Sequence, residues 1–394
     1  MSKVIAHIDL NTFFVRCEEL KNPKLEGKPV AVGHNGRGGI VSTCSYEARN
    51  FGVRSGMPMF KAKELCPKLI IIEGNYNDYE AYSNEFEQFI KRYTSKIEKT
   101  SIDECYADFT EQIKQQRDPI KYFKDLQYNL FKTTGLKCSI GISTTKFLAK
   151  MGSDLKKPMG ITVIRKSEIQ KILFNNPVET FYGIGKKTAT KLNEMNVNTI
   201  GELYSKLKDK NSDVYALFGK FAHDYIDCLE GNSSDLVIPF EEDQKSISTR
   251  RTLPYDINNK ENLHHYLIKV FNETYEKFLS LKVLTGGITI SLRYTDFKTK
   301  TFARQLDTPI DDKNILLNEL ESLYDEIYHG ENVRQIGVIF YNLSKRYEKN
   351  FQMTLDNYLY FNKKDETLDI MNELNKNLET NSKLFIASDL LKDK

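Results

Sequence analysis

A chain of 394 residues is long for one domain and, at about 150 residues per domain, predicts two to four domains. No apolar run approaches the roughly 20 residues that span a bilayer, and the first ten residues lack an export signal, so we expect a soluble, cytoplasmic protein. The six cysteines form no close pair, which argues against a zinc knuckle or disulfide framework, and a net charge of +3 is too small to indicate a nucleic-acid partner by itself.

The first predicted strand ends at an acidic residue. Residues 4–8 form a short apolar run that is typical of a buried strand, and the run ends at Asp9. Asp9 is therefore expected at the exit of a strand. The following elements are then expected in chain order: a helix over 11–21, a strand over 29–33, a turn into a segment at 40–45, a helix from 46 and a helix over 59–65.

Two further acids lie in a second strand region. Residues 77–93 carry aromatic and apolar side chains at helical spacing, which predicts a helix with a core-facing stripe. Residues 96–109 predict two short strands around Asp103 and Glu104. A helix over 122–133 and a strand over 137–143 are expected after them. This alternation of strands and helices predicts an α+β sheet domain.

The C-terminal half has two different patterns. From about residue 167, short helices flank Gly183 and Gly185, which predicts a small helical domain. Beyond residue 241, the order of elements is β-α-β-β-α-β, which predicts a compact split sheet with both helices on one face. Its expected elements are a strand over 246–252, a helix over 262–281, strands over 286–296 and 300–306, a helix over 314–328 and a strand over 334–343.

Asp9, Asp103 and Glu104 are candidates for a metal site if one sheet brings them together. Carboxylates at close range repel unless a cation lies between them, and oxygen ligands without Cys or His favour magnesium or manganese. Two such ions suit an in-line phosphoryl displacement. Spacing alone leaves a second interpretation open, because acids at strand ends are usually solvated turn residues.

Cationic and hydroxyl side chains accompany these acids. Residues 42–49 offer hydroxyls and the Arg49 guanidinium before a helix start, which suits the oxygens of a triphosphate. Lys157 could add a second cation. A surface Arg49 paired with Glu47 and a solvated Lys157 remain the alternative interpretation.

At these residues the chain resembles the Y-family translesion DNA polymerases, whose bacterial members include the DinB and UmuC groups. Residues 8–14 look like the first metal motif of that family, and residues 101–104 look like the second. Residues 46–58 resemble its nucleotide-contacting stretch. Residues 141–150 and 156–160 match its later palm segments, and the resemblance covers about residues 3–345.

The resemblance implies template-directed synthesis across damaged DNA at low fidelity and without proofreading, by transfer of dNMP from dNTP to a primer 3′-hydroxyl. It implies two Mg²⁺ ions, with Mn²⁺ as a possible substitute, held by Asp9, Asp103, Glu104 and the Leu10 carbonyl. Phe14 is implied as the ring that excludes a sugar 2′-hydroxyl. The implied triphosphate contacts are Thr43, Tyr46, Arg49, Lys157 and the N–H groups of Phe13 and Phe14.

The resemblance also implies a right-handed polymerase acting as a monomer on primer-template DNA. Its expected parts are a palm at 1–12 and 75–166, fingers at 13–74, a helix-hairpin-helix thumb at 167–236, a little finger at 241–346 and a tail at 347–394. Its expected DNA contacts are Gly183, Gly185, Lys186, Arg250, Arg251, Arg293, Lys300 and Arg334. Gln352 and Leu355 resemble a degraded sliding-clamp motif, although Asp356 stands where an aromatic is usual.

Three alternatives stay open at this point. The subgroup is undecided between DinB-like and UmuC-like. A catalytically silent scaffold would have lost its acids, whereas all three are present here. A nucleotide cyclase would share the carboxylates but would need no parts that grip DNA.

Overall fold

The chain forms two compact units, Met1–Asp243 and Gln244–Lys394. The computed structural model describes residues 3–233, 236–239 and 243–345. Gln352 and Leu355, the candidate clamp residues, therefore lie outside the described part. Within that part, every helix is too short or too polar to cross a bilayer.

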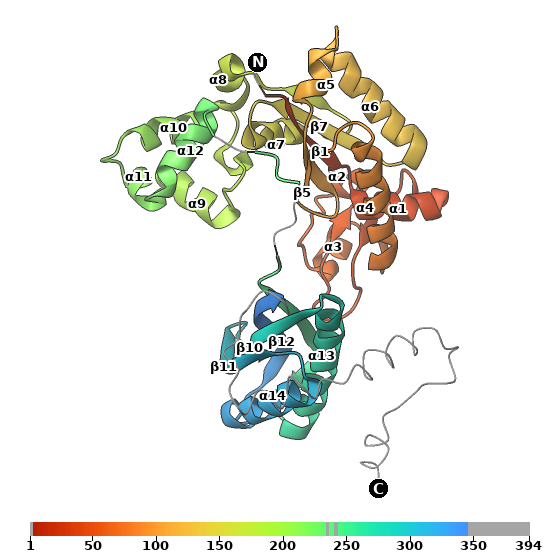
Figure 1. Ribbon diagram of the computed structural model, residues 1–394, viewed down its shortest axis with the longest axis vertical. Coiled ribbons are helices and arrows are strands. Elements are labelled where there is room, and N and C mark those ends of the chain that lie inside the picture. The colour runs from red at the N-terminus through yellow and green to blue at the C-terminus, as the bar shows by residue number, and fades with distance from the viewer. Residues whose placement is uncertain (1–2, 234–235, 240–242, 346–394) are drawn as a thin grey trace. The chain divides into compact units, whose positions relative to one another are not determined.

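A five-stranded sheet is the centre of the first unit (Figure 1). In spatial order its strands are β5 (Ile97–Lys99), β6 (Glu104–Asp108), β1 (Ile5–Leu10), β7 (Cys138–Ser143) and β8 (Ile161–Val163). Neighbours are antiparallel except for β7 and β8, which are parallel. The first strand in the sequence thus becomes the middle strand, between the strand that begins with Glu104 and β7.

All six residues of β1 are buried, because helices cover both faces of the sheet. Successive side chains of a strand point to opposite faces. Ala6, Ile8 and Leu10 belong to the large core on one face. Three helices supply that core with aromatic and aliphatic side chains, namely α1 (Phe13–Lys21), α4 (Tyr76–Lys91) and α6 (Pro119–Thr134).

Helix α7 (Lys146–Leu155) covers the opposite face, where it packs on β7 and β1. Thr145 caps its first turn by accepting a hydrogen bond from the N–H of Leu148 at 3.3 Å. The close approach depends on Gly141 of β7, since a Cβ there would lie 1.9 Å from the carbonyl oxygen of Ala149. Glycine at this point lets the helix backbone lie directly against the sheet.

The region between α1 and α4 holds a small separate sheet in the order β3-β2-β4. Its strands and helices are β2 (Val30–Val32), β3 (Thr43–Cys44), β4 (Ile70–Ile72), α2 (Tyr46–Asn50) and α3 (Met59–Leu65). Ser45 caps α2 by accepting from the N–H of Ala48, which fixes the turn between Thr43 and Tyr46. Two further short elements of this unit are η1 (Pro23–Leu25) and α5 (Thr110–Lys114).

The end of the first unit is helical, and it shares a core with side chains of α7. Its elements are η2 (Lys166–Glu168), α8 (Ile169–Leu173), η3 (Val178–Thr180), α9 (Lys186–Glu194), α10 (Ile200–Lys208), α11 (Asp213–Phe218) and α12 (Phe221–Glu230). Thr199 and Glu202 form a capping box that begins α10. Gly183 adopts a φ of 100° in the turn before α9, a conformation that favours glycine.

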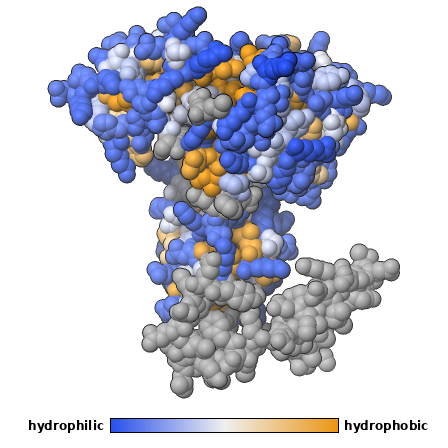
Figure 2. Space-filling view, turned by 45° about the horizontal axis from the view of Figure 1, so that its top comes forward, coloured by the Kyte–Doolittle hydropathy of each residue, from blue (hydrophilic) through white to orange (hydrophobic). Residues whose placement is uncertain are grey.

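The second unit is a four-stranded antiparallel sheet in the order β11-β10-β12-β9. Its elements are β9 (Ser246–Ile257), α13 (Lys260–Ser280), β10 (Val283–Tyr294), β11 (Thr299–Ile310), α14 (Lys313–Ile327) and β12 (Val333–Lys345). Both helices contribute to one core on one face of the sheet. This is the expected β-α-β-β-α-β order, with every strand longer than expected. On the faces visible in Figure 2, hydrophilic residues predominate in both units.

Helix α7 and strands β4 and β8 are among the elements of the first unit that were not predicted from the sequence. Helix α7 begins three residues after β7 ends, and β4 and β8 have three residues each. Strands this short carry too few residues for alternation to be visible. Their position depends on neighbours distant in the sequence, since β4 pairs with β2 and β8 pairs with β7.

Replacing Gly141 by Ala tests the packing of α7 on the sheet. Because the added methyl group would meet helix backbone, the free energy of unfolding should fall by about 1–3 kcal/mol or more. Urea unfolding followed by circular dichroism measures it. Gly185→Ala is the comparison, because a Cβ there meets no atom within 4 Å and only the smaller cost of alanine at a helix N-cap should remain. Equal stability of Gly141→Ala and the wild type would contradict the packing described here.

Candidate active site

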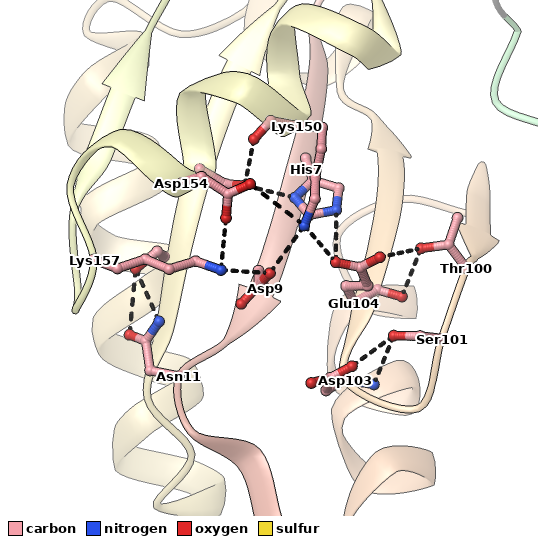
Figure 3. Close-up of polar contacts among 12 residues, drawn as sticks. His7, Asp9, Asn11, Thr100, Ser101, Asp103, Glu104, Lys150, Asp154 and Lys157 are labelled. Atoms are coloured by element: carbon pink, nitrogen blue, oxygen red, sulfur yellow. Dashed lines mark hydrogen bonds and ion pairs between the residues drawn. The ribbon is translucent and has the colours of Figure 1, made fainter. Parts of the chain in front are cut away.

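The register between β1 and β6 sets Asp9 directly opposite Glu104 (Figure 3). Opposed residues of an antiparallel pair extend on the same face of the sheet. Ligand atoms of Asp9, Glu104 and His7 all lie within 4.8 Å of one another. Two of the three acids singled out in the sequence, which are 95 positions apart, therefore meet on the face that α7 covers.

Asp103 lies in the turn that leads into β6. Its backbone carbonyl accepts a hydrogen bond from the N–H of Leu10 at 2.9 Å, which ties this turn to the exit of β1. Its carboxylate accepts from the Ser101 hydroxyl at 2.6 Å. Burial raises the pKa of the Asp103 carboxyl, and the negative charges of Asp9 and Glu104 raise it further. Asp103 thus interacts electrostatically with Asp9 and Glu104, although it is not part of the close group that these two form with His7.

Two lysines neutralise the facing carboxylates. Lys150 Nζ lies 2.6 Å from Glu104 Oε2 and 3.2 Å from Asp9 Oδ2. Lys157 Nζ lies 2.8 Å from the same Asp9 oxygen and 2.7 Å from Asp154 Oδ1. Burial lowers the pKa of both ammonium groups, but the surrounding carboxylates outweigh burial and raise it above the ordinary value. Both lysines therefore remain charged at neutral pH.

His7 lies between Glu104 and Ser153 and contacts both. The hydroxyl of Ser153 donates to the carbonyl of Lys150 at 2.8 Å and also lies 2.8 Å from His7 Nδ1. His7 Nε2 is 3.4 Å from Glu104 Oε2. Burial raises the pKa of the Glu104 carboxyl, but the contacts from His7 and Lys150 hold it well below its ordinary value.

Sequence reasoning did not identify His7, Lys150 or Asp154 as site residues. A signal for His7 was present, because a residue two positions before Asp9 on a strand shares its face. Lys150 and Asp154 carried a weaker signal, since four residues apart on a helix places them on one side. That signal required α7 to be recognised as a helix.

A cavity of about 140 Å³ opens beside the acids. Its lining residues are Asp9, Leu10, Asn11, Thr12, Phe13, Thr43, Tyr46, Arg49, Asp103 and Lys157. Arg49 lies over the Tyr46 ring, 4.9 Å from its centroid, and burial raises the pKa of the Tyr46 hydroxyl. The cavity is thus lined both by acids and by cationic and hydroxyl groups.

The first turn of α1 also lies at this cavity. Thr12 precedes the helix with a φ of 47° and its side chain makes no capping hydrogen bond. The N–H groups of Phe13 and Phe14, in the first turn of α1, therefore donate no hydrogen bond to the side chain of the N-cap residue. Such groups attract anions.

Phe14 is half-buried and held in place by stacking. Its ring is stacked on Tyr79 at 4.4 Å between centroids and 18° between planes. The Tyr79 hydroxyl donates to Glu18 at 2.7 Å. Glycine at position 74 leaves room for the Tyr79 hydroxyl, because a Cβ there would lie 1.8 Å from its oxygen. Phe14 also lines a second cavity, of about 320 Å³, with Ser42 and other residues.

The candidate DNA contacts of the helical part lie at the start of α9. Gly185 is the N-cap of this helix, without a side-chain cap, and Lys186 is its first residue. A Cβ on Gly185 would meet nothing within 4 Å. The first N–H groups of α9 are therefore accessible to an anion.

The candidate arginines of the second unit differ in their partners. Arg251 forms an ion pair with Glu273 at 2.7 Å. Arg293 and Arg334 lie over the exposed ring of Phe297, at 5.2 and 4.8 Å from its centroid. Within residues 243–345, no carboxylate lies within 4 Å of either guanidinium. The charges of Arg293 and Arg334 are therefore more available to an anion than the charge of Arg251.

The other two candidates of this unit lie on the same sheet. Arg250 is exposed on β9 and pairs in register with Gly337 of β12. Lys300 is exposed on β11, with its Nζ 5.5 Å from the centroid of Tyr294.

Comparison with known proteins gives consistent matches. A family model described as the impB/mucB/samB family matches residues 8–154, and the model of that family's C-terminal domain matches residues 244–355. A DNA polymerase IV of Oceanobacillus iheyensis is 36% identical over 383 residues, which are 96% of this chain and 90% of the relative. DNA polymerase IV 1 of Bacillus subtilis is 35% identical over 381 residues, 96% of this chain and 91% of the relative.

Solved structures give the same result. A Y-family DNA polymerase chimera of Dbh and Dpo4 has a TM-score of 0.73 at 28% identity, covering 87% of this chain and 99% of that one. An insertion ternary complex of Dbh DNA polymerase has a TM-score of 0.61 at 29% identity, with the same coverage. The expected resemblance and fold class are thereby confirmed. The chain therefore belongs to the impB/mucB/samB family and is a Y-family DNA polymerase.

Proposed function

We propose that Asp9, Asp103 and Glu104 are the catalytic acids with which this polymerase performs translesion synthesis. The primer 3′-hydroxyl attacks the α-phosphorus of a dNTP paired to the template, and pyrophosphate leaves. The register that sets Asp9 opposite Glu104, with Asp103 tied to Leu10, supports this assignment most strongly. The adjoining cavity contains the cationic groups that a triphosphate needs.

The donor set fits a hard divalent cation. Three carboxylates and the backbone carbonyl of Leu10 are the oxygen ligands that Mg²⁺ and Mn²⁺ prefer. We assign two ions to these donors. When bound, they would lower the pKa of the primer hydroxyl and neutralise charge on the leaving phosphates.

The chain's own groups would bind and orient the triphosphate. Arg49 and Lys157 line the cavity and offer positive charge, and Thr43 and Tyr46 offer hydroxyls. The start of α1 adds the N–H groups of its first turn. Because these groups surround the phosphates and not the base, they would hold any dNTP and leave base selection to the template.

We assign the remaining parts by the same reasoning. Residues 1–12 and 75–166 are the palm, 13–74 the fingers, 167–236 the thumb and 241–346 the little finger. The thumb would bind DNA phosphates through Gly183, Gly185 and Lys186. The little finger would bind them through Arg250, Arg293, Lys300 and Arg334, with Arg251 contributing less because Glu273 neutralises it.

The remaining partner that we assign is a sliding clamp, which would bind the C-terminal tail. Residues 347–394 contain Gln352 and Leu355, which we assign to a sliding clamp. The enzyme itself would act as a monomer in the cytoplasm.

Replacing Asp103 by Asn should abolish primer extension, on the order of a thousandfold, because a charge-stabilising group is lost without a change of shape. Single-nucleotide extension measures the rate, and fluorescence anisotropy checks that DNA binding is retained. Asp125→Asn, on the exposed face of α6, is the control and should leave both unchanged. Full extension by the Asp103 variant would remove this acid from the mechanism.

Replacing Phe14 by Ala should admit ribonucleotides, because the ring stacked on Tyr79 would otherwise collide with a 2′-hydroxyl. The ratio of kcat/KM for dNTP over rNTP should fall by about a hundredfold or more. Phe14→Leu retains most of the bulk and should retain most of the discrimination. An unchanged ratio in Phe14→Ala would refute the assignment of a sugar-excluding ring.

Replacing Arg334 by Ala should weaken primer-template binding and reduce the slope of log affinity against log salt by about one. Arg251→Ala should change that slope less, because Glu273 already neutralises this guanidinium. Anisotropy titrations between low and physiological salt measure both slopes. Equal losses in the two variants would contradict the division of arginines made here.

A further inference from the structure

The Lys150 ammonium occupies the space between two acids that face each other across the sheet. Its Nζ lies 2.6 Å from Glu104 and 3.2 Å from Asp9, and its side chain is 12% exposed. Two carboxylates at this range repel strongly without a positive charge between them. Lys150 therefore holds the position and supplies the charge that a cation bound by these two acids would supply.

The backbone that carries Lys150 cannot follow a displaced side chain. Helix α7 packs on β7 through Gly141, where no Cβ would fit. The Lys150 carbonyl accepts from the Ser153 hydroxyl, which is held in turn by His7. The ammonium group of Lys150 can therefore move only by rotation of its four-carbon side chain, which has many rotamers.

A second acceptor for the ammonium lies one helical turn away. Asp154 Oδ2 is 3.7 Å from Lys150 Nζ, and the Asp154 side chain is 46% exposed. Asp154 thus lies on the solvent side of the two inner acids. Lys157 differs from Lys150, because it lines the triphosphate cavity and makes no contact with Glu104.

We propose that Lys150 is a placeholder for the divalent cation: its ammonium holds Asp9 and Glu104 in position until the cation binds, and then moves to Asp154. The inference rests on the proposed metal site. Direct competition follows, because ammonium and metal ion cannot occupy the same space between the same oxygens. The acids keep their geometry before the cation arrives, at the cost of a weaker apparent affinity for it.

Binding of Mn²⁺ alone tests this proposal, since it requires neither DNA nor turnover. Electron paramagnetic resonance of free Mn²⁺ gives the Kd for the full-length protein. Lys150→Met should tighten binding by about tenfold, because the competing charge is removed while the aliphatic bulk stays. Lys146→Met is the matched control on the same helix, since Lys146 pairs with Glu98, and it should leave the Kd unchanged.

A double-mutant cycle tests the role of Asp154. Asp154→Asn should weaken Mn²⁺ binding about threefold in the wild type, because the displaced ammonium loses its acceptor. The same substitution should have a much smaller effect once Lys150 is Met. Equal weakening in both backgrounds would mean that Asp154 acts by its charge alone, and would overturn the transfer of Lys150 to it.

Thermal unfolding supplies a second readout. With a chelator present, Lys150→Met should unfold at a lower temperature than the wild type, because its carboxylates repel. Saturating Mn²⁺ should remove that difference, since ligand binding stabilises the folded state. Unchanged or weaker Mn²⁺ binding by Lys150→Met would overturn the proposal and leave the metal site intact, whereas no Mn²⁺ binding by the wild type would overturn both.

Discussion

Mutual repulsion of carboxylates is the constraint on which this structure depends. Asp9 and Glu104 are opposed in the register of β1 and β6, and Asp103 lies in the adjoining turn. Such an arrangement is stable only where positive charge is close, because each acid raises the free energy of the others. The fold meets this constraint with two lysines from the α7 region, and the same carboxylates are the proposed ligands of divalent cations.

The other parts of the first unit keep that cluster rigid and place substrate groups around it. Close packing of α7 at Gly141 brings Lys150 over the acids. The start of α1 and the small sheet near Arg49 complete the cavity. The ring of Phe14 is stacked against Tyr79 and lines a different cavity from the one beside the acids. Under the proposed function, selection of the sugar would therefore be separate from binding of the phosphates. Such a separation would suit a polymerase that accepts damaged bases, because it would recognise the sugar and the phosphates without selecting the base.

The strand that leads to Asp9, the two strands around Asp103 and Glu104, and the order of elements in the second unit were predicted from the sequence. These predictions succeeded because alternation and short apolar runs are local properties. Helix α7 and the roles of His7 and Lys150 were missed, because they follow from which strands are neighbours and how closely a helix approaches them. The pairing of Arg251 with Glu273 was missed for the same reason. Gln352 and Leu355 stay predictions, since they lie outside the described residues.

The most direct test of the central claim is the location of bound metal in a crystal of the enzyme with a dideoxy-terminated primer, template and dNTP. Anomalous scattering from Mn²⁺ would locate the ions independently of any assumption about side chains. We expect two peaks coordinated by Asp9, Asp103 and Glu104, with Lys150 Nζ withdrawn from the space between Asp9 and Glu104. Peaks remote from these acids, with Lys150 still between them, would contradict this expectation.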